Sequence, residues 1–292
     1  MRLHFIGVGK MGLPMAGHLA AGGHAVTVND IDPARLKLTH GQGLAVATDV
    51  GSAIAAAEVI FSSLPDDAAV LDVAGQVAAA ARRGAIYVDT STVSVAASGV
   101  ASQQCAAAGV HYLRSTVSGN NKMAQAAQLT VMASGPRAAY DTVLPLLRLL
   151  GPNQFYLGEA EQARLMKLVV NLMIAQTSAM LAEALTLGRK GGLDWRDMWQ
   201  VLGASAVGSP IVKAKSEQLI ERDFTPTFTV EQMIKDLDLI LDAGVANHVP
   251  LPQTALTHQL MHAAVAQGDA LDDYAAIIKS VERSAGLSGS PV

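Results

Sequence analysis

The chain has little of what favours a secreted, membrane-bound or nucleic-acid-binding protein. Among 292 residues there is one cysteine, Cys105, which excludes an intramolecular disulfide framework. Its Ala-rich surroundings favour helix packing over a role as nucleophile. Aromatic residues make up 4%, and the formal net charge of −4 does not favour binding to nucleic acid or a membrane surface. No basic segment followed by an apolar run opens the sequence, so we expect no signal peptide and a cytoplasmic location.

One long apolar stretch, residues 168–187, imitates a membrane span. Polar residues interrupt it, among them Asn171 and Glu183, and such groups are costly in hydrocarbon. We therefore expect a long helix buried in protein and no membrane span. Half of the residues are hydrophobic, so a large core is available, and the length exceeds that of a typical single core. Two domains are expected.

The first half of the chain alternates short β-rich runs with Ala-rich helical runs, which indicates a mostly parallel, doubly wound α/β sheet. The expected strands are 2–7, 25–30, 58–63, 85–89, 110–114 and 128–133, and the expected helices are 33–39, 66–81 and 93–107. In such a sheet a ligand lies across the carboxyl ends of the strands. These ends carry the loops at 65–67, 90–92 and 117–120.

The second half shows no strand pattern and predicts helices only. A long helix over about 161–190 ends at Gly191-Gly192, and Thr229 with Gln232 forms a capping box that opens a later helix. Further helices are expected at 194–203, 209–222, 230–244, 251–267 and 272–284. The sequence thus predicts a doubly wound domain over 1–160 and an all-helical domain over 161–292. A cleft between them is the default ligand site.

The first strand leads directly into a glycine-rich motif, Gly7-Val8-Gly9-Lys10-Met11-Gly12, which has the form G-x-G-x-x-G. Gly7 permits the turn, Gly9 lets the backbone approach a pyrophosphate, and Gly12 allows close packing of helix on strand. The second strand ends in Asn29-Asp30, at the distance where a carboxylate holds a ribose 2′-hydroxyl. A glycine-rich turn in another α/β fold is the alternative. The spacing favours a Rossmann dinucleotide-binding domain.

Polar residues at three further places are candidates for chemistry. Lys167 and Asn171 are four residues apart and share one face of the long helix, in an apolar neighbourhood where a lysine is unusual. A lysine that reaches the surface is the other interpretation. The pair Lys235-Asp236 lies on an apolar helix, where a solvated pair is the alternative. Residues 118–120, Ser-Gly-Asn, offer backbone N–H groups to a carboxylate, or form a plain turn.

The histidines do not have the spacing of metal ligands. His258 and His262 are four residues apart, but Gln259 stands where the H-E-x-x-H motif has glutamate. We predict no metal site.

Four blocks of the sequence resemble the β-hydroxyacid dehydrogenase family, which includes 3-hydroxyisobutyrate dehydrogenase and tartronate semialdehyde reductase and is related to 6-phosphogluconate dehydrogenase. The blocks are 7–16, 117–119, 158–184 with its lysine and asparagine, and 235–252 with Lys-Asp-Leu and Val-Pro-Leu-Pro. The resemblance implies that Lys167 is the general acid/base and that Asn171 binds the substrate beside it. It implies three more sets of contacts: Ser118 and Gly119 with the substrate carboxylate, Lys235 with both the substrate and the cofactor near the nicotinamide, and Leu64, Pro65 and Thr92 with the cofactor.

This chain departs from the family pattern at two places. Asn120 stands where many members have a second glycine, so it is a candidate substrate contact that alters specificity. Of the family's paired asparagines only Asn171 is present, since Val170 precedes it. Substrate identity is therefore not carried over, and a chain of 292 residues lacks the C-terminal extension typical of 6-phosphogluconate dehydrogenase.

Asp30 bears on the choice of cofactor. In relatives that use NADP an arginine commonly follows the second strand, whereas Ile31 follows here and the carboxylate would repel a 2′-phosphate. Arg35, one turn on, could soften this preference. We expect an oxidoreductase that transfers hydride between NAD, rather than NADP, and a short β-hydroxy acid. The alternatives are an NADPH-dependent semialdehyde or imine reductase and a non-catalytic dinucleotide-binding protein. Family members pair through the helical domain, so a homodimer or homotetramer is expected.

Overall fold

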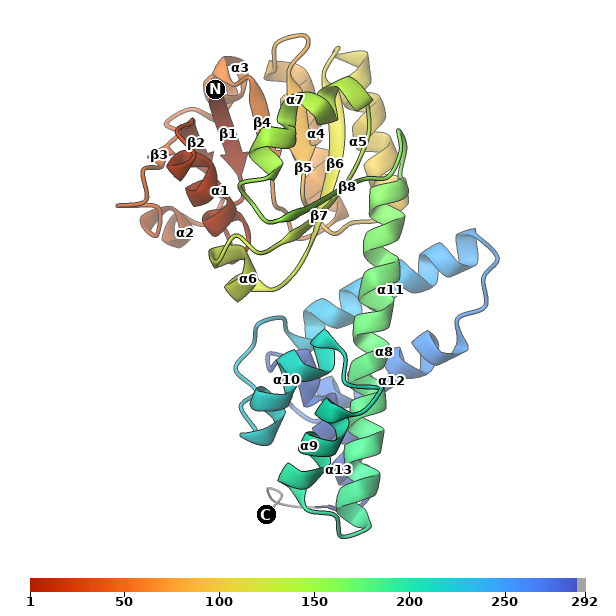
Figure 1. Cartoon of the computed structure of the whole chain (residues 1–292). Coiled ribbons are helices and arrows are strands. Elements are labelled where there is room, and N and C mark those ends of the chain that lie inside the picture. Colours follow the sequence, from red (N-terminus) through yellow and green to blue (C-terminus); the bar gives the residue numbers. More distant parts are fainter. Residues whose placement is uncertain (288–292) are drawn as a thin grey trace. The chain divides into compact units, whose positions relative to one another are not determined.

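The protein consists of two compact units in a computed structural model that describes residues 1–287. The first unit is Met1–Lys167 and the second begins at Leu168. Figure 1 labels the elements of each unit. From the sequence we expected the domain boundary at residue 160, before the long helix. The two compact units divide after Lys167, inside that helix.

The first unit is built on one eight-stranded, mostly parallel sheet, which confirms the doubly wound fold class. The strand order is β3-β2-β1-β4-β5-β6-β7-β8, and among neighbouring strands only β6 and β7 run antiparallel. Because β4 lies on the opposite side of β1 from β2, the topological switch point falls between β1 and β4. The strands are β1 (Arg2–Ile6), β2 (Ala25–Asn29), β3 (Ala45–Val46), β4 (Val59–Ser62), β5 (Ile86–Asp89), β6 (His111–Ser118), β7 (Thr130–Ser134) and β8 (Asn153–Tyr156).

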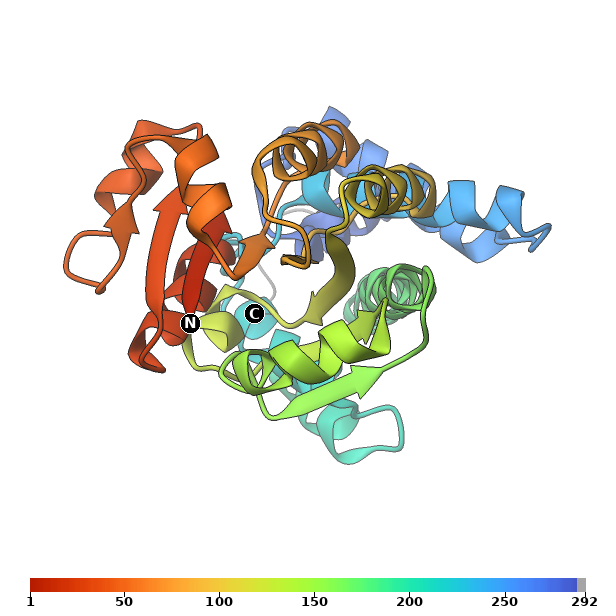
Figure 2. The same cartoon turned by 90° about the horizontal axis from the view of Figure 1, so that it is seen from above.

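Helices cover both faces of this sheet. Successive side chains of each strand point to opposite faces, and both faces are apolar. Phe5 belongs to a buried cluster with residues of α1 and α7, whereas its neighbour Ile6 belongs to another with residues of α3, α4 and α5. Figure 2 shows the sheet between α4 and α5 on one side and α7 on the other. The helices of this unit are α1 (Gly12–Ala21), α2 (Pro33–Lys37), α3 (Val50–Ala56), α4 (Asp67–Ala80), α5 (Val95–Ala107), α6 (Asn121–Gln125) and α7 (Arg137–Leu147).

Several elements of the first unit were not predicted from the sequence. Strands β3 and β8 are short and lie at the two edges of the sheet, where exposure weakens the hydrophobic pattern. Helices α3, α6 and α7 were also missed, although α7 buries residues at helical spacing around Pro145. The segment 117–120 was expected to be a loop, but β6 continues to Ser118 because it pairs with β7.

Cys105 lies on α5 and is fully buried against the sheet. Burial raises the pKa of its thiol to about 12, so the thiolate that a nucleophile needs is scarce at neutral pH. The interpretation of Cys105 as a packing residue is confirmed by this position.

The second unit is helical, as predicted, and α8 leads into it from the first unit. Its apolar core includes Trp195, Leu237 and Ile277. The predicted capping box at Thr229 and Gln232 is present at the start of α11. The helices are α8 (Gln162–Lys190), α9 (Trp195–Ala204), α10 (Pro210–Ile220), α11 (Val230–Ala246), α12 (Pro252–Ala266), the 3₁₀ turn η1 (Tyr274–Ala276) and α13 (Ile277–Ser284).

Within residues 1–287, α8 is the one helix whose length and apolar composition would let it cross a membrane. In its most apolar window 44% of the residues are buried inside the protein.

Candidate functional site

The loop between β1 and α1 has the geometry that the glycine motif predicted. Gly7 has φ +87°, and a Cβ on it would lie 2.4 Å from the carbonyl oxygen of Ser63. A Cβ on Gly12 would lie 1.9 Å from the carbonyl oxygen of Gly7. A Cβ on Gly9, by contrast, would meet nothing within 4 Å. Gly7 and Gly12 are therefore needed for packing, whereas Gly9 leaves its backbone face open, as close approach of a phosphate requires.

Asp30, directly after β2, is hydrogen-bonded to this loop. One carboxylate oxygen accepts the Val8 N–H at 2.8 Å, and the other accepts the N–H of Asp32 at 2.9 Å. The preceding Asn29 carbonyl accepts the Gly7 N–H at 2.9 Å. Each carboxylate oxygen keeps a lone pair for a further donor. The residues expected to hold an adenosine ribose are thus fixed beside the glycine loop.

The loops after β4 and β5 are joined to each other at the same edge of the sheet. The Leu64 N–H donates to the Ser91 hydroxyl at 2.9 Å, and the Thr90 hydroxyl donates to the Ser62 carbonyl at 2.6 Å. These bonds hold the loops that carry Leu64-Pro65 and Thr92, the residues expected to line the cofactor site. The first unit therefore brings its predicted cofactor residues to the carboxyl ends of β1, β2, β4 and β5.

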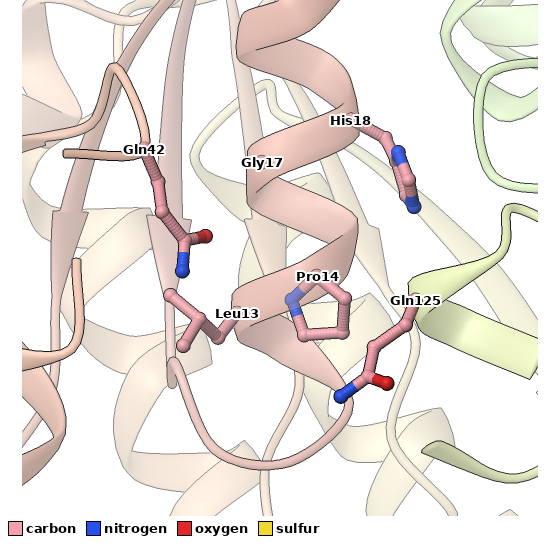
Figure 3. A pocket seen from close by; sticks show the side chains of 6 residues that line it. All are labelled: Leu13, Pro14, Gly17, His18, Gln42 and Gln125. Carbon is pink, nitrogen blue, oxygen red and sulfur yellow. The ribbon is translucent and has the colours of Figure 1, made fainter. Parts of the chain in front are cut away.

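An open cavity of about 340 Å³ lies along α1 (Figure 3). Its lining is Leu13, Pro14, Gly17, His18, Gln42 and Gln125. His18 also bonds the Ala124 carbonyl through Nε2 at 2.9 Å, which ties α1 to α6. None of the predicted cofactor or substrate residues lines this cavity, so it is distinct from the candidate site.

Ser118 and Gly119 lie beyond the carboxyl end of β5, the strand next to β6. Asp89, the last residue of β5, pairs with Arg114, and β6 continues four residues further to Ser118. At about 3.3 Å per residue this projection is about 13 Å. Gly119 has φ +135°, a conformation that side chains disfavour. The predicted substrate residues therefore lie on an extension of β6.

Asn120 has a structural task that the sequence did not indicate. Its side-chain oxygen accepts the Met123 N–H at 3.0 Å and caps α6. One lone pair of this oxygen and both amide N–H groups remain for another partner. A contact of Asn120 with substrate would therefore have to be compatible with its role as the cap of α6.

Lys167 lies one turn after Arg164 on α8, and Arg164 is a residue that the sequence analysis did not select. The Arg164 side chain is completely buried and pairs with the equally buried Asp89. Burial would raise the pKa of Asp89, but the Arg164 guanidinium and the Ser91 and Ser62 hydroxyls outweigh it, so this pKa lies below its usual value. The turn that precedes Lys167 is thus held by a buried charge pair.

In the second unit, Asn171 is buried, and its side-chain amide donates to a carboxylate oxygen of Asp236 at 2.5 Å. The other Asp236 oxygen lies 2.9 Å from Lys235 Nζ. Asp236 is 1% exposed, so the alternative of a solvated Lys235-Asp236 pair is wrong for the carboxylate. A carboxylate only accepts hydrogen bonds, so Asn171 must present Nδ2 to Asp236. Two predicted site residues, Asn171 and Lys235, therefore meet at one buried carboxylate.

The sequence contained a signal for Asp236. It occupies the buried face of α11 between Met233 and Ile240, where a carboxylate is rare unless it is paired. The histidines do not contribute to this site. Among residues 1–287, no three His, Cys, Asp or Glu side chains are grouped so that they could hold a metal ion.

Two family models together match nearly all of the chain. The model described as the NAD binding domain of 6-phosphogluconate dehydrogenase matches residues 2–158. The model described as NAD-binding of NADP-dependent 3-hydroxyisobutyrate dehydrogenase matches residues 162–281. A dinucleotide-binding sheet followed by this helical domain defines a nicotinamide-dependent oxidoreductase.

Individual relatives agree with this class. The chain is 34% identical over 294 residues to 2-(hydroxymethyl)glutarate dehydrogenase of Eubacterium barkeri, covering 99% of this chain and 98% of that one. It is 31% identical to 2-hydroxy-3-oxopropionate reductase of Escherichia coli (strain K12), covering 97% of each. The solved structure of Mycobacterium tuberculosis 3-hydroxyisobutyrate dehydrogenase with L-serine superposes with a TM-score of 0.88 at 28% identity, covering 96% of this chain and 98% of that one. The chain belongs to the β-hydroxyacid dehydrogenase family, whose members are NAD(P)-dependent hydroxyacid dehydrogenases and reductases.

The three glycines of the loop can be separated by experiment. We expect Gly9→Val to fold with a melting temperature near that of the wild type but to bind NADH at least tenfold more weakly, because the side chain fills the open face. Gly12→Ala should lower the melting temperature or prevent folding, since its Cβ overlaps the Gly7 carbonyl. Thermal melting and NADH fluorescence titration measure the two effects.

Gly75 on α4 supplies the matched control, because a Cβ there also meets nothing within 4 Å. Gly75→Ala should leave both folding and NADH binding unchanged. Wild-type NADH affinity in Gly9→Val would contradict the assignment of this loop.

Proposed function

We propose that this protein transfers hydride between NAD and a short β-hydroxy acid, with Lys167 as the general acid/base. The observation that carries the proposal is the open backbone face at Gly9. The N–H of the neighbouring Val8 donates to Asp30, and α8 of the same chain carries Lys167 and Asn171 on one face. A dinucleotide site and a lysine–asparagine pair are the two parts that this reaction requires.

The residues of the first unit fit a nicotinamide dinucleotide. The loop 7–12 and the N-terminus of α1 would hold the pyrophosphate, and Asp30 would accept hydrogen bonds from the adenosine ribose. Leu64, Pro65 and Thr92 would line the remaining length of the cofactor. When bound, the nicotinamide ring supplies a hydride acceptor in the oxidative direction and a hydride donor in the reductive one.

Lys167 would accept and donate the proton. In the oxidative direction its neutral amine accepts the hydroxyl proton of the substrate as the carbinol carbon loses hydride, and the alcohol becomes a carbonyl. In the reductive direction the ammonium donates the same proton. Asn171 would orient the hydroxyl. Its Nδ2 donates to Asp236, which fixes the side chain, so its Oδ1 and its second N–H would be available to the substrate.

The substrate class that we propose is supported by a feature that the relatives' names share. 2-(Hydroxymethyl)glutarate, 3-hydroxyisobutyrate and L-serine each carry a hydroxymethyl group on the carbon next to a carboxylate. 2-Hydroxy-3-oxopropionate is the aldehyde of such a compound. We propose that this chain also acts on primary β-hydroxy acids, with Ser118 and Gly119 binding the shared carboxylate.

A panel of these acids tests the proposal. Purified protein with NAD is mixed with 3-hydroxyisobutyrate, D-glycerate, L-serine, threonate, 4-hydroxybutyrate and 2-(hydroxymethyl)glutarate, and formation of NADH is followed by absorbance. Turnover should be confined to acids that carry a hydroxymethyl group on the carbon next to the carboxylate. Binding of NADH without turnover of any acid, in either direction, would favour a non-catalytic dinucleotide-binding protein.

Substitution of the lysine separates chemistry from binding. Lys167→Ala should lower kcat by about 10²- to 10⁴-fold, the range typical of a lost general acid/base, while NADH affinity changes less than about threefold. Lys190→Ala, at the far end of the same helix, is the matched control and should retain full activity. A nearly active Lys167→Ala variant would show that another group moves the proton.

The preference for NAD rests on this chain's own residues, since one matched family model refers to NADP-dependent enzymes. The Asp30 carboxylate accepts the Val8 N–H of the glycine loop, and the fully exposed Ile31 follows it. Arg35 Nε lies 3.8 Å from Asp32 Oδ2. A 2′-phosphate would therefore meet the negative charge of Asp30 and would lack an adjacent arginine.

We expect at least a tenfold preference for NAD in kcat/KM. The double variant Asp30→Asn with Ile31→Arg should lower the ratio of NAD to NADP efficiency by at least tenfold, because a repulsive charge is removed and a guanidinium is added. Ile31→Ala is the control and should keep the wild-type ratio. A wild-type enzyme that prefers NADP would contradict the assignment.

We also propose that the protein is a homodimer or homotetramer. Met173, Met180 and Leu187 are 65%, 62% and 75% exposed and follow one another at intervals of seven residues, so they form one apolar stripe along α8. A stripe of this kind on a helix surface is typical of an interface between subunits.

Charge placed in the stripe should weaken the assembly. Met173→Lys with Met180→Lys should shift the sedimentation coefficient of the protein toward that of the monomer at micromolar concentration. Lys substitution of the exposed Val100 on α5 serves as the control and should not change it. A wild-type protein that sediments as a monomer would rule out the proposal.

A further inference from the structure

Asp89, at the carboxyl end of β5, is the centre of a buried polar network that the proposed mechanism does not use. One of its carboxylate oxygens accepts the Ser62 hydroxyl at 2.8 Å and the Ser91 hydroxyl at 2.5 Å. The other accepts the Tyr112 hydroxyl at 2.9 Å and the Arg164 guanidinium. The carboxylate and the guanidinium are both without solvent exposure. An ion pair this deep persists only when its remaining donors and acceptors are also satisfied.

Arg164 meets that condition through all three of its nitrogens. Nε donates to the Ser98 hydroxyl at 3.1 Å, one terminal nitrogen donates to the Ser91 carbonyl, and the other donates to Asp89 and, at 2.9 Å, to the Tyr112 hydroxyl. These partners belong to β5, β6, α5 and the loop between β5 and α5. Because a guanidinium is planar and presents its donors in a fixed fork, this arrangement determines the direction of the side chain as well as its position.

The network reaches the proposed site in two directions. The Ser91 hydroxyl that donates to Asp89 also accepts the Leu64 N–H, so the loop after β4 depends on the same carboxylate. In the other direction Arg164 belongs to the first turn of α8, three residues before Lys167. The Thr116 hydroxyl donates to the neighbouring Ala163 carbonyl at 3.0 Å and fixes the same turn.

We infer that Arg164 and Asp89 are positioning residues, which fix the first turn of α8, and so Lys167, relative to the loops that hold the nicotinamide end of the cofactor. This inference rests on the proposed dehydrogenase function. The energetic reason is geometric. A hydrophobic pair could hold the helix equally firmly, but it would permit small rotations of the turn, and displacement of a reacting group by 1 Å can cost about 100-fold in rate.

The test uses one variant that keeps the positive charge and one that removes both charges, and neither retains the guanidinium fork. Arg164→Lys retains the positive charge opposite Asp89 but loses the fork. We expect kcat to fall about 30- to 100-fold, with the KM for hydroxy acid and the affinity for NADH changed less than about threefold. The pH profile of kcat should also shift, because the amine of Lys167 then lies in altered surroundings. The double variant Asp89→Asn with Arg164→Gln avoids an unpaired buried charge and should show the same loss of kcat.

Arg222 supplies a matched control in the second unit. Its guanidinium pairs with the buried Glu282 through two hydrogen bonds of 2.6 and 3.1 Å. Arg222→Lys should lower the melting temperature comparably while leaving kcat and its pH profile unchanged.

A measurement that does not require activity accompanies the kinetics. Hydrogen exchange of the backbone amides in residues 160–170 should become at least tenfold faster in Arg164→Lys and stay unchanged in Arg222→Lys. Wild-type kcat in folded Arg164→Lys, or a loss of kcat no larger than the loss of folded protein, would overturn the inference. If the wild type oxidises no hydroxy acid, the proposed function fails, whereas the exchange data still decide whether Arg164 fixes this turn.

Discussion

The buried ion pair between Arg164 and Asp89 is the contact on which the arrangement of the first unit depends most. It joins the sheet to the first turn of a helix that contributes to both compact units. The same carboxylate organises the loops after β4 and β5 through Ser91. Because the pair is completely dry, removal of one partner leaves an uncompensated charge, and the cost of breaking a buried pair is typically 3–5 kcal/mol.

A second buried carboxylate has a comparable task in the helical unit. Asp236 fixes the amide of Asn171 and lies beside Lys235. In both units, therefore, a carboxylate with almost no solvent exposure is hydrogen-bonded to polar side chains at or near the residues to which we propose to assign the reaction. Under that proposal Lys167 would transfer the proton without also having to hold the fold together. This separation of tasks is typical of sites in which supporting side chains are locked by packing and hydrogen bonds.

Much of the fold could be predicted from local patterns. The glycine motif, the run of hydrophobic strands and the long apolar helix each depend on neighbours in the sequence, so their residues carry the signal directly. Edge elements could not be predicted in this way. β3 has two exposed residues and β8 is only partly buried, so neither has the continuous apolar run of a central strand. Helix α7 did carry a helical pattern of buried residues, and the proline inside it hid that pattern.

The candidate site divides along the same line. Sequence alone determined the dinucleotide loop, the carboxylate after β2 and the lysine–asparagine spacing, because each is a matter of residue type at a short, regular interval. Only the tertiary structure decided that Asp89 meets Arg164 across 75 residues and that Asp236 meets Asn171 across 65. Nothing local marks such partners. They are selected by burial, since a charged group removed from water must be paired with whatever donor the packed elements bring to it.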